Sequence, residues 1–464
     1  MKQETSSSFS PDSRFLVVII LLLAGISMVN ISLMPPFQGP DEIQHFLYSA
    51  SYAYSKPDME KVEARVLQIL KDYKWFHFVG IGPGWENTKQ ISDIPFVFHF
   101  DREKQSTRKT AFHFFYGKVL KLSGIKDVLT AFYLMRIISG MIYICIFLLA
   151  YYFFKTHFPG QWKYLIAGLL VIFQLGTILN AVNYDVFLVL FGTLFFIFSF
   201  RYLYFGKKRD LFVLGLSAIA AVFIKLIGFM FIVYLAILLL MRTILFKRDR
   251  DAQWKPKRMG YVVLGALLFV IAFSWMNYLF PGRFFQLYSQ LFRGITDFFS
   301  SVNSQGGEKI LSADFFNSIL DSFYFCTGWM GFKLSGAWYI IIRIFLIISA
   351  VGLGLIAFSR KTREAVTEKK WLLYTFIVFI LHLLSIWLYY GHGTYSQGRY
   401  VYPIVLPIVF IIYAGLGAIE KKFQWSVPYL KTGFILFQVV LWVFAISRII
   451  SVFYLEMSSP HVGL

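Results

Sequence analysis

The sequence reads PPFQGPDEIQHFLYSA at residues 35–50, directly after the first long apolar run, where the chain would leave a bilayer. Gly39-Pro40 predicts a turn into a helix with Pro40 at the first helical position, where its missing N–H costs nothing. Asp41 and Glu42 would then lie in the first turn, where the helix dipole favours negative charge. We therefore expect a helix that begins just outside the first membrane span, with two carboxylates at its start.

This helix would have two different faces. Asp41, His45, Tyr48 and Tyr52 share one face at helical spacing. The other face is mostly apolar and carries Ile43, Phe46, Leu47, Ala50 and Tyr54. The pattern predicts a helix that lies on the membrane, apolar side down, with its acidic and imidazole groups facing an aqueous cleft. The alternative is that the two carboxylates only complement the helix N-terminus.

The composition predicts an all-α polytopic membrane protein. The chain has 464 residues, 58% of them hydrophobic, and apolar runs of about 20 residues recur along it. A membrane β-barrel would show short alternating strands instead of these continuous runs. The first run, Phe15 to Met34, is too long for a signal peptide, and Pro35-Pro36 is not a small-residue cleavage site. We expect this run to be retained as the first span.

The apolar runs predict about 11 transmembrane helices in a single domain, residues 1–464. The approximate bounds of ten of them are 15–34, 127–154, 164–180, 185–205, 211–224, 228–245, 259–279, 338–358, 371–390 and 433–453. The tenth span along the chain follows the turn 391–400 and ends before the loop that begins with Lys421. Two long polar excursions interrupt the spans: 35–126, which contains the acidic motif, and 280–337. In the first of them, Met59–Lys74 and Thr110–Gly124 have the composition of helices that lie beside the membrane.

The charge distribution predicts the topology. A net charge of +20 would indicate nucleic-acid binding in a soluble protein, but here much of it lies in short loops between apolar spans. The basic clusters at 155–163, 201–209, 242–258, 360–370 and 421–431 all fall on one side. The turns at 180–184 and 391–398 on the other side hold no Lys or Arg. By the positive-inside rule the basic side is cytoplasmic, so both long excursions are outer loops. We expect a protein of the cytoplasmic membrane without a nucleic-acid partner.

The two cysteines carry no further signal. Cys145 and Cys326 are far apart in the sequence, and Cys145 lies inside a predicted span. This usage predicts neither a disulfide framework nor a metal site.

Charged residues from four distant parts of the chain would meet at the outer membrane boundary. Asp41 and Glu42 follow the first span, Asp185 opens the fourth, Lys225 separates the fifth and sixth, and Arg399 opens the tenth. Charges at this depth are costly, so they tend to be paired or functional. The cations could hold a phosphate, Arg in a bidentate manner, and a carboxylate could take a proton from a hydroxyl. Sugar transfer from a polyprenyl-phosphate donor needs this combination, because the phosphate leaves as an anion without a catalytic acid.

Each of these residues also has a structural interpretation. Arg399 could anchor its span at the interface, Asp185 could cap the fourth span, and Lys225 could reach to the interface along its aliphatic stem. His45 and His392 could be ordinary polar loop residues. Arg136, near the start of the second span, reads as another interfacial anchor.

The same motifs resemble the C-type (GT-C) membrane glycosyltransferases. A first span followed by Pro-Asp-Glu-x-x-His-Phe, here residues 40–46, resembles the Asp-Glu-type pair in the first outer loop of that superfamily. Residues 111–124 and 134–140 are similar to its juxtamembrane helix and the start of its second span. Asn183-Tyr184-Asp185 resembles the position of its second acidic residue, and 220–228 the turn between its fifth and sixth spans.

Within that superfamily, the chain is most similar to a large bacterial family of predicted membrane proteins. The hallmarks of that family are Pro-Asp-Glu-Pro-x-His-Phe, Phe-Gly-Trp and Gln-Gly-Arg-Tyr, which appear here at 40–46, 326–329 and 397–400. Ile43 replaces the second proline of the first motif, and Thr327 stands where Phe is usual. Neither departure removes a charged group.

The resemblance implies an inverting transferase with its site on the outer side of the membrane. Asp41 would be the base, with Glu42 beside it, and Asp185 would contact the acceptor or a metal. The resemblance implies that Arg399 and Lys225 bind the phosphate. We also expect His45, Tyr400 and His392 to bind substrate. It leaves open whether Mg²⁺ or Mn²⁺ takes part.

Three functions remain open on the sequence alone. The first is transfer of sugar from a polyprenyl-phosphate donor to a cell-envelope glycan or lipid. The second is a flippase or transporter of lipid-linked sugars, which would usually show internal repeats and charges at mid-membrane; no repeat is evident. The third is a glycan polymerase or ligase that uses a pyrophosphate-linked donor.

Overall fold

The computed structural model describes residues 11–79, 87–91, 94, 109–245, 313–325, 334–358, 365–390 and 397–456. Every regular element in these ranges is a helix. The long helices are α1 (Pro11–Leu33), α7 (Val128–His157), α10 (Asp185–Phe205), α11 (Lys208–Ile224), α12 (Met230–Leu245), α16 (Gly336–Phe358), α17 (Ala365–Tyr390), α18 (Val405–Lys422) and α19 (Tyr429–Ile450). The shorter ones are α2 (Glu42–Ala53), α3 (Lys56–Asp72), α4 (Trp75–Val79), α6 (Ala111–Ser123), α8 (Trp162–Leu170), α9 (Phe173–Leu179), α15 (Ala313–Tyr324), η4 (Leu226–Phe229), η6 (Gly398–Ile404) and η7 (Ser451–Glu456).

Within the described ranges, seven helices are long and apolar enough to cross a membrane. They are Phe15–Leu33, Val128–His157, Asp185–Phe205, Gly336–Phe358, Lys369–Trp387, Gly398–Lys422 and Tyr429–Leu455. The pair α8 and α9, bent by 64°, makes an eighth if it is counted as one span. The chain is therefore an all-α, multi-pass membrane protein, as the composition predicts.

The predicted count of about 11 spans is not confirmed. Helix α11, with 17 residues, is shorter than a typical span, and the apolar helix Ile227–Thr243 falls in the same shorter class. The predicted span at 259–279 lies outside the described residues. The run at 164–180, predicted as one helix, is broken between Leu170 and Phe173.

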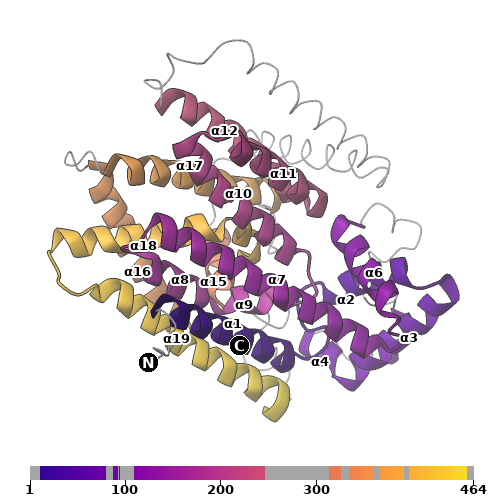
Figure 1. Cartoon of the computed structure of the whole chain (residues 1–464). Helices are drawn as coiled ribbons and strands as arrows, with labels where there is room; N and C mark the ends of the chain where they lie inside the picture. Colours follow the sequence, from indigo (N-terminus) through magenta and orange to yellow (C-terminus); the bar gives the residue numbers. More distant parts are fainter. Residues whose placement is uncertain are drawn as a thin grey trace, which may run out of the picture.

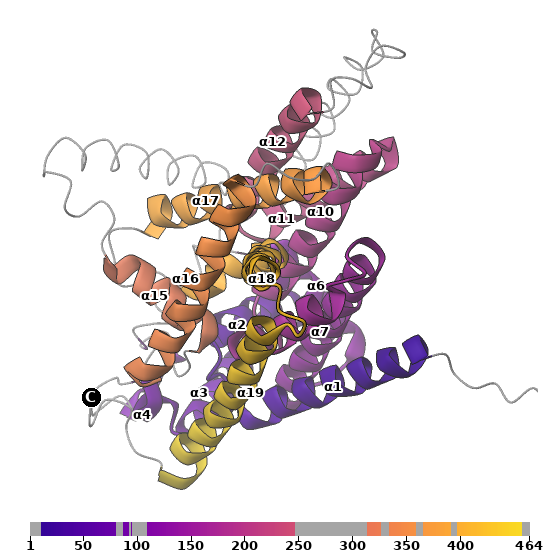
Figure 2. The same ribbon diagram turned by 90° about the vertical axis from the view of Figure 1, so that its left-hand side faces the viewer.

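Helix α18 lies at the centre of the bundle, where Figure 2 shows it end-on. It packs against α8, α10, α16, α17 and α19. The span Gly398–Lys422, which α18 forms together with η6, is the most buried of the seven, with 83% of its most apolar stretch inside the protein. In α1, α16 and α19 most residues are at least partly exposed, as expected for helices that face lipid.

Helices α2, α3, α4 and α6 gather at one end of the bundle (Figure 1). All four come from the first predicted outer loop, and α2 packs against α6 and α3. The expectation that α2 rests on lipid is wrong, because its apolar residues Ile43 and Phe46 are covered by protein. The opposite face is also covered, since His45 and Tyr48 are buried as well. Helix α2 is thus a core helix of this end of the molecule.

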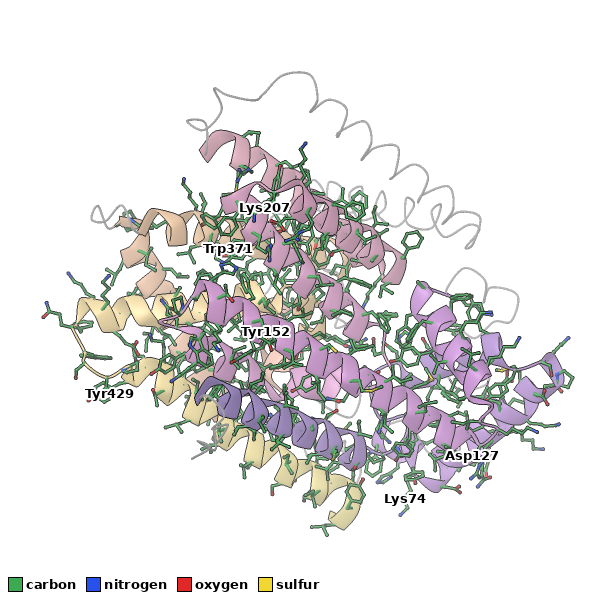
Figure 3. The ribbon with its side chains drawn as sticks, viewed as in Figure 1. Lys74, Asp127, Tyr152, Lys207, Trp371 and Tyr429 are labelled. Atoms are coloured by element: carbon green, nitrogen blue, oxygen red, sulfur yellow. The ribbon has the colours of Figure 1, made fainter. Side chains whose placement is uncertain are left out.

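The two ends of the bundle carry different loops. In Figure 3, Lys74 and Asp127 lie at the end with α2 and α6, whereas Tyr429 lies at the opposite end. The turn 423–428, which follows Lys421 and Lys422, joins α18 to α19 at that opposite end. Lys421 and Lys422 are therefore at the opposite end of the bundle from the first predicted outer loop, as the charge pattern predicts.

We expect a cysteine-labelling experiment to assign the two ends to opposite sides of the membrane. In a chain whose native cysteines are replaced by serine, Lys126→Cys should react with a membrane-impermeant maleimide in intact cells. Ser426→Cys should react only after permeabilisation. Both positions are exposed, so accessibility within the protein does not distinguish them. Labelling of Ser426→Cys in intact cells would contradict the topology.

Candidate active site

The acidic motif forms a tight turn before α2. The helix begins at Glu42, and Asp41 is its N-cap, with a left-handed φ of 60°. The prediction that Pro40 takes the first helical position is therefore wrong by two residues. The reason is local: the backbone N–H of Gly39 donates to Glu42 Oε2 at 2.9 Å, which closes the turn ahead of the helix. Asp is among the few residues that tolerate a left-handed backbone.

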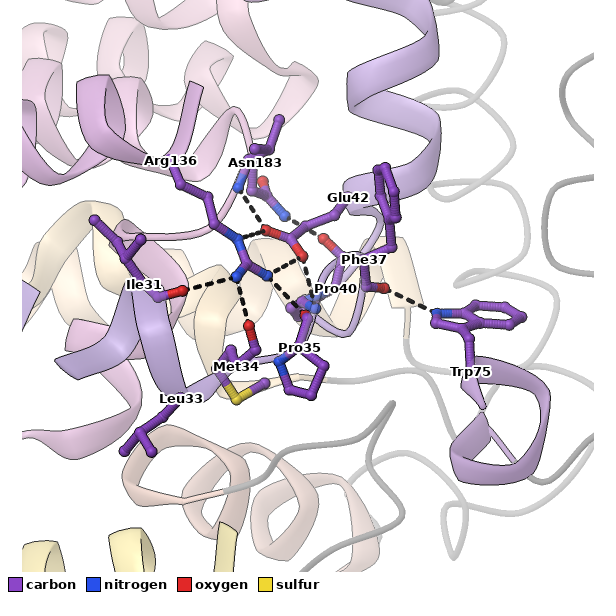
Figure 4. Close-up of polar contacts among 12 residues, drawn as sticks. Ile31, Leu33, Met34, Pro35, Phe37, Pro40, Glu42, Trp75, Arg136 and Asn183 are labelled. Carbon is purple, nitrogen blue, oxygen red and sulfur yellow. Dashed lines mark hydrogen bonds and ion pairs between the residues drawn. The ribbon is translucent and has the colours of Figure 1, made fainter. Parts of the chain in front are cut away.

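The Glu42 side chain points into the protein and forms an ion pair with Arg136 of α7 (Figure 4). Arg136 Nε donates to Glu42 Oε1 at 2.9 Å, and Arg136 Nη2 donates to Oε2 at 2.7 Å. The other donors of Arg136 bind the carbonyls of Ile31, Met34 and Pro35 at the end of α1. Arg136 is only 1% exposed, so its interpretation as an interfacial anchor is wrong.

This ion pair also fixes the turn before α10. The backbone N–H of Val182 donates to Glu42 Oε1 at 2.9 Å, and Asn183 Nδ2 donates to the carbonyl of Pro40 (Figure 4). Each carboxylate oxygen of Glu42 thus accepts two hydrogen bonds. Glu42, predicted as a catalytic residue, has the contacts of a structural one: it joins α1, α2, α7 and the start of α10.

Four of the charged residues singled out in the sequence meet in one cluster. Arg399 Nη2 donates to Asp41 Oδ2 at 2.6 Å, and Lys225 Nζ donates to Asp185 Oδ1 at 3.0 Å. Arg399 Nε lies 4.0 Å from Asp185 Oδ2, which links the two pairs. Asp41 is 24% exposed at its side chain, while the other three side chains are at most 10% exposed. The four residues come from the turn before α2, from α10, from the α11–η4 junction and from η6.

Two tyrosines enclose the lysine of this cluster. Lys225 Nζ lies 4.3 Å from the ring centroid of Tyr184 and 4.6 Å from that of Tyr400. The guanidinium of Arg399 also lies over the Tyr400 ring, at 5.3 Å. Burial alone would lower the pKa of Lys225, but its electrostatic interactions with Asp185, Tyr184 and Tyr400 together outweigh burial and raise that pKa above its ordinary value. Lys225 therefore stays charged inside the protein. It does not extend to the membrane interface, so the structural interpretation of this residue is wrong.

The segment η6 holds Arg399 in place through the backbone. A Cβ on Gly398 would lie 2.2 Å from the backbone nitrogen of Phe323 in α15, so only glycine fits at this position of the Gln-Gly-Arg-Tyr motif. The N–H of Gly398 donates to Ser322 Oγ at 2.7 Å, and the carbonyl of Tyr400 lies 2.8 Å from His382 Nε2. Contacts from α15 and α17 thus fix the residues on both sides of Arg399.

His45 lies beside this cluster. Its ring packs edge-to-face against Tyr184, with centroids 4.3 Å apart, and its Nδ1 is 2.9 Å from Nε2 of His113 in α6. Burial, together with the charges of Arg399 and Lys225, holds the pKa of His45 well below its ordinary value. His392, the other predicted histidine, lies outside the described residues.

Several buried polar atoms of the cluster have no hydrogen-bond partner among the described residues. They are Nε and Nη1 of Arg399, Nε2 of His45 and Oδ2 of Asp185. The two Arg399 atoms can only be donors, and Nε2 of His45 is a donor in one of the two tautomers of the neutral ring. Buried donors without acceptors are costly, so the cluster is suited to bind an anion with several oxygens.

The donor set does not fit a divalent metal well. Among the described residues, no group of three or more His, Cys, Asp or Glu side chains is placed to hold a metal ion. Asp41 and Asp185 are each paired with a buried cation, which would repel Mg²⁺ or Mn²⁺.

Sequence analysis did not predict that Arg136 and His113 contribute to the site. Arg136 lies 94 residues from Glu42, and His113 lies 68 residues from His45. Both lie in segments that resemble the superfamily, but no local sequence pattern identifies the residue that each of them contacts.

Comparison of the chain with models of protein families, with curated proteins and with solved structures finds no match in any of the three.

Proposed function

We propose that the protein is an inverting glycosyltransferase of the GT-C type, which uses a polyprenyl-phosphate-linked sugar as donor. The observation that supports this most is the cluster of Asp41, Asp185, Lys225 and Arg399 at the end of the bundle. It combines two carboxylates with two cations and with buried donors that lack acceptors. The acceptor would be a cell-envelope glycan or lipid on the outer face of the bacterial cytoplasmic membrane.

Donor binding would begin with an exchange of partners at Arg399. A phosphate diester that enters the cluster offers oxygens to the free Nε and Nη1 of Arg399, which lies in a low-dielectric environment where such bonds are strong. The phosphate then competes with Asp41 for the guanidinium. Asp41, the most exposed member of the cluster, is thereby released toward the acceptor. Lys225 adds a second positive charge from its place between Tyr184 and Tyr400.

The chemical step is a single displacement at the anomeric carbon. The acceptor hydroxyl oxygen attacks that carbon, and the bond between carbon and phosphate oxygen breaks with inversion. The electron pair of the broken bond leaves with the lipid phosphate, whose added negative charge Arg399 and Lys225 stabilise. The hydroxyl proton goes to Asp41. Asp185 keeps Lys225 in position through the 3.0 Å ion pair.

Arg399→Ala is expected to weaken donor binding more than Arg399→Lys. Lysine keeps the positive charge but loses the planar fork that contacts two oxygens at once. Loss of a charge-assisted hydrogen bond of this kind costs about 1.5–3 kcal/mol, or roughly a 10- to 150-fold rise in Kd. The measurement is the affinity of the purified protein for farnesyl phosphate, with Arg343→Ala, at an ion pair in α16, as the matched control. Binding of the Arg399→Ala protein like wild type would show that Arg399 only anchors its helix.

A further inference from the structure

Two buried histidines face each other across helices α2 and α6. His45 Nδ1 and His113 Nε2 are 2.9 Å apart, and the two rings are stacked with centroids 5.2 Å apart. Helices α2 and α6 lie side by side (Figure 1). One turn after His113, a Cβ on Gly117 would lie 2.4 Å from Cβ of Tyr52, so glycine is what lets the helices approach.

A backbone amide determines which nitrogen of each ring carries a proton. The N–H of Thr110 donates to His113 Nδ1 at 2.9 Å, and a backbone N–H can only donate. Nδ1 of His113 therefore has no proton, and the proton of this ring is on Nε2. That N–H donates to Nδ1 of His45, so the proton of His45 is on its own Nε2. Both rings are neutral in this arrangement.

The Nε2–H of His45 is left without an acceptor among the described residues, although the residue is only 4% exposed. The Tyr184 ring contacts both this imidazole and Lys225: its centroid is 4.3 Å from the His45 centroid and 4.3 Å from Lys225 Nζ. Arg399 has two further unpartnered donors in the same cluster. Unsatisfied donors on two separate segments are explained most simply by one bound group that supplies several acceptor oxygens.

We infer that His45 donates its Nε2–H to a phosphate oxygen of the lipid-linked donor, and that His113 is a positioning residue that holds His45 in this tautomer. The inference rests on the proposed function, since it takes the phosphate from that substrate. A neutral donor at this position adds a hydrogen bond without adding a third cation to Lys225 and Arg399. The anionic lipid phosphate is then held during transfer and is still able to leave afterwards.

The first test compares two replacements of His45 by the affinity of the full-length protein in nanodiscs for farnesyl phosphate. In His45→Gln the carboxamide nitrogen takes the place of Nε2 and can still donate. In His45→Phe the ring remains but the donor is lost. We expect the Phe variant to bind about tenfold more weakly and the Gln variant to stay within about threefold of wild type. Equal affinity of the Phe variant and wild type would overturn the inference.

The second test reads the tautomer itself by nitrogen NMR of labelled histidine, with the His45 signal assigned from its loss in His45→Gln. We expect the proton on Nε2 in the wild type, a mixture of tautomers in His113→Leu, and restoration in His113→Gln, whose carboxamide can accept from Thr110 and donate to His45. Asp127→Ala is the matched control, because it removes the N-cap of α7 but lies outside the cluster. If His113 only caps α6, His113→Leu should lose thermal stability as Asp127→Ala does and leave the tautomer unchanged, which would overturn its positioning role.

The outcomes separate this inference from the proposed function. If farnesyl phosphate binds to wild type and binds only weakly to Arg399→Ala, the phosphate site is supported independently of the results for the His45 variants. In that case His45→Phe decides the inference alone. If wild type does not bind farnesyl phosphate, both are contradicted. A proton on Nδ1 of His45, or on both nitrogens, would overturn the tautomer assignment while the phosphate site stands.

Discussion

Asp41→Asn is expected to bind donor at least as well as wild type and to transfer sugar roughly a hundredfold more slowly or worse. Asparagine keeps the size of the side chain and an oxygen for the Arg399 hydrogen bond, but it cannot take the hydroxyl proton. It also removes the negative charge that competes with phosphate for the guanidinium. Loss of turnover without loss of binding is therefore the signature of a base at this position.

The measurement is single-turnover transfer with radiolabelled donor bound in advance and membranes that lack the protein as the source of acceptor. Asp58→Asn is the matched control, because it neutralises an exposed aspartate on α3 at the same end of the molecule. Near-normal transfer by Asp41→Asn would move the base elsewhere, with Asp185 the next candidate. Normal transfer in variants of both aspartates would favour the transporter.

Arg136→Met is expected to destabilise the folded protein by about 3–5 kcal/mol, the cost of breaking a buried ion pair by removing one partner. It leaves the fully buried Glu42 carboxylate without its counter-ion, and three carbonyls at the end of α1 lose their donor. Glu42→Gln should also destabilise the folded protein, because it leaves Arg136 charged and unpaired. Thermal unfolding of the purified protein measures both.

A double variant and a control distinguish loss of the Glu42–Arg136 ion pair from nonspecific destabilisation by the substitutions. The combination of Glu42→Gln with Arg136→Met should cost less than the sum of the two single changes, because no unpaired charge remains. Arg343→Met is the control: its ion pair with Asp321 is partly exposed, with 36% of the arginine side chain accessible, so little stability should be lost. A strictly additive double variant would contradict the structural role assigned to Glu42.

The sequence predicted that charged residues of the site would come together, but not how they pair. The predicted topology puts four residues at span ends on the same side of the membrane: Asp41, Asp185, Lys225 and Arg399. Their proximity could therefore be predicted. Which carboxylate contacts which cation depends on how α10 and η6 pack, and no local pattern encodes that. Arg136 was misread for the same reason: a position near the start of a span is typical of an anchor, while its partner is 94 residues away.

Helix boundaries show the same limit. The break between α8 and α9 lies at Val171-Ile172, where no proline or glycine marks it, so the periodicity predicted one continuous helix. The start of α2 was predicted two residues early, because Pro40 is a common first residue of helices and the contact of Glu42 with the Gly39 amide is not visible in the sequence. A side-chain contact made in the folded protein decided the second case.

The proposed function requires the cluster around Arg399 to bind the phosphate of a lipid-linked sugar. An experimental structure of the full-length protein in nanodiscs with farnesyl phosphate tests this binding most directly. We expect phosphate density within hydrogen-bond distance of Arg399 and His45 Nε2 and close to Lys225 Nζ, with Asp41 released from the guanidinium. Phosphate bound away from these residues, or an Asp41–Arg399 pair unchanged with ligand present, would contradict it.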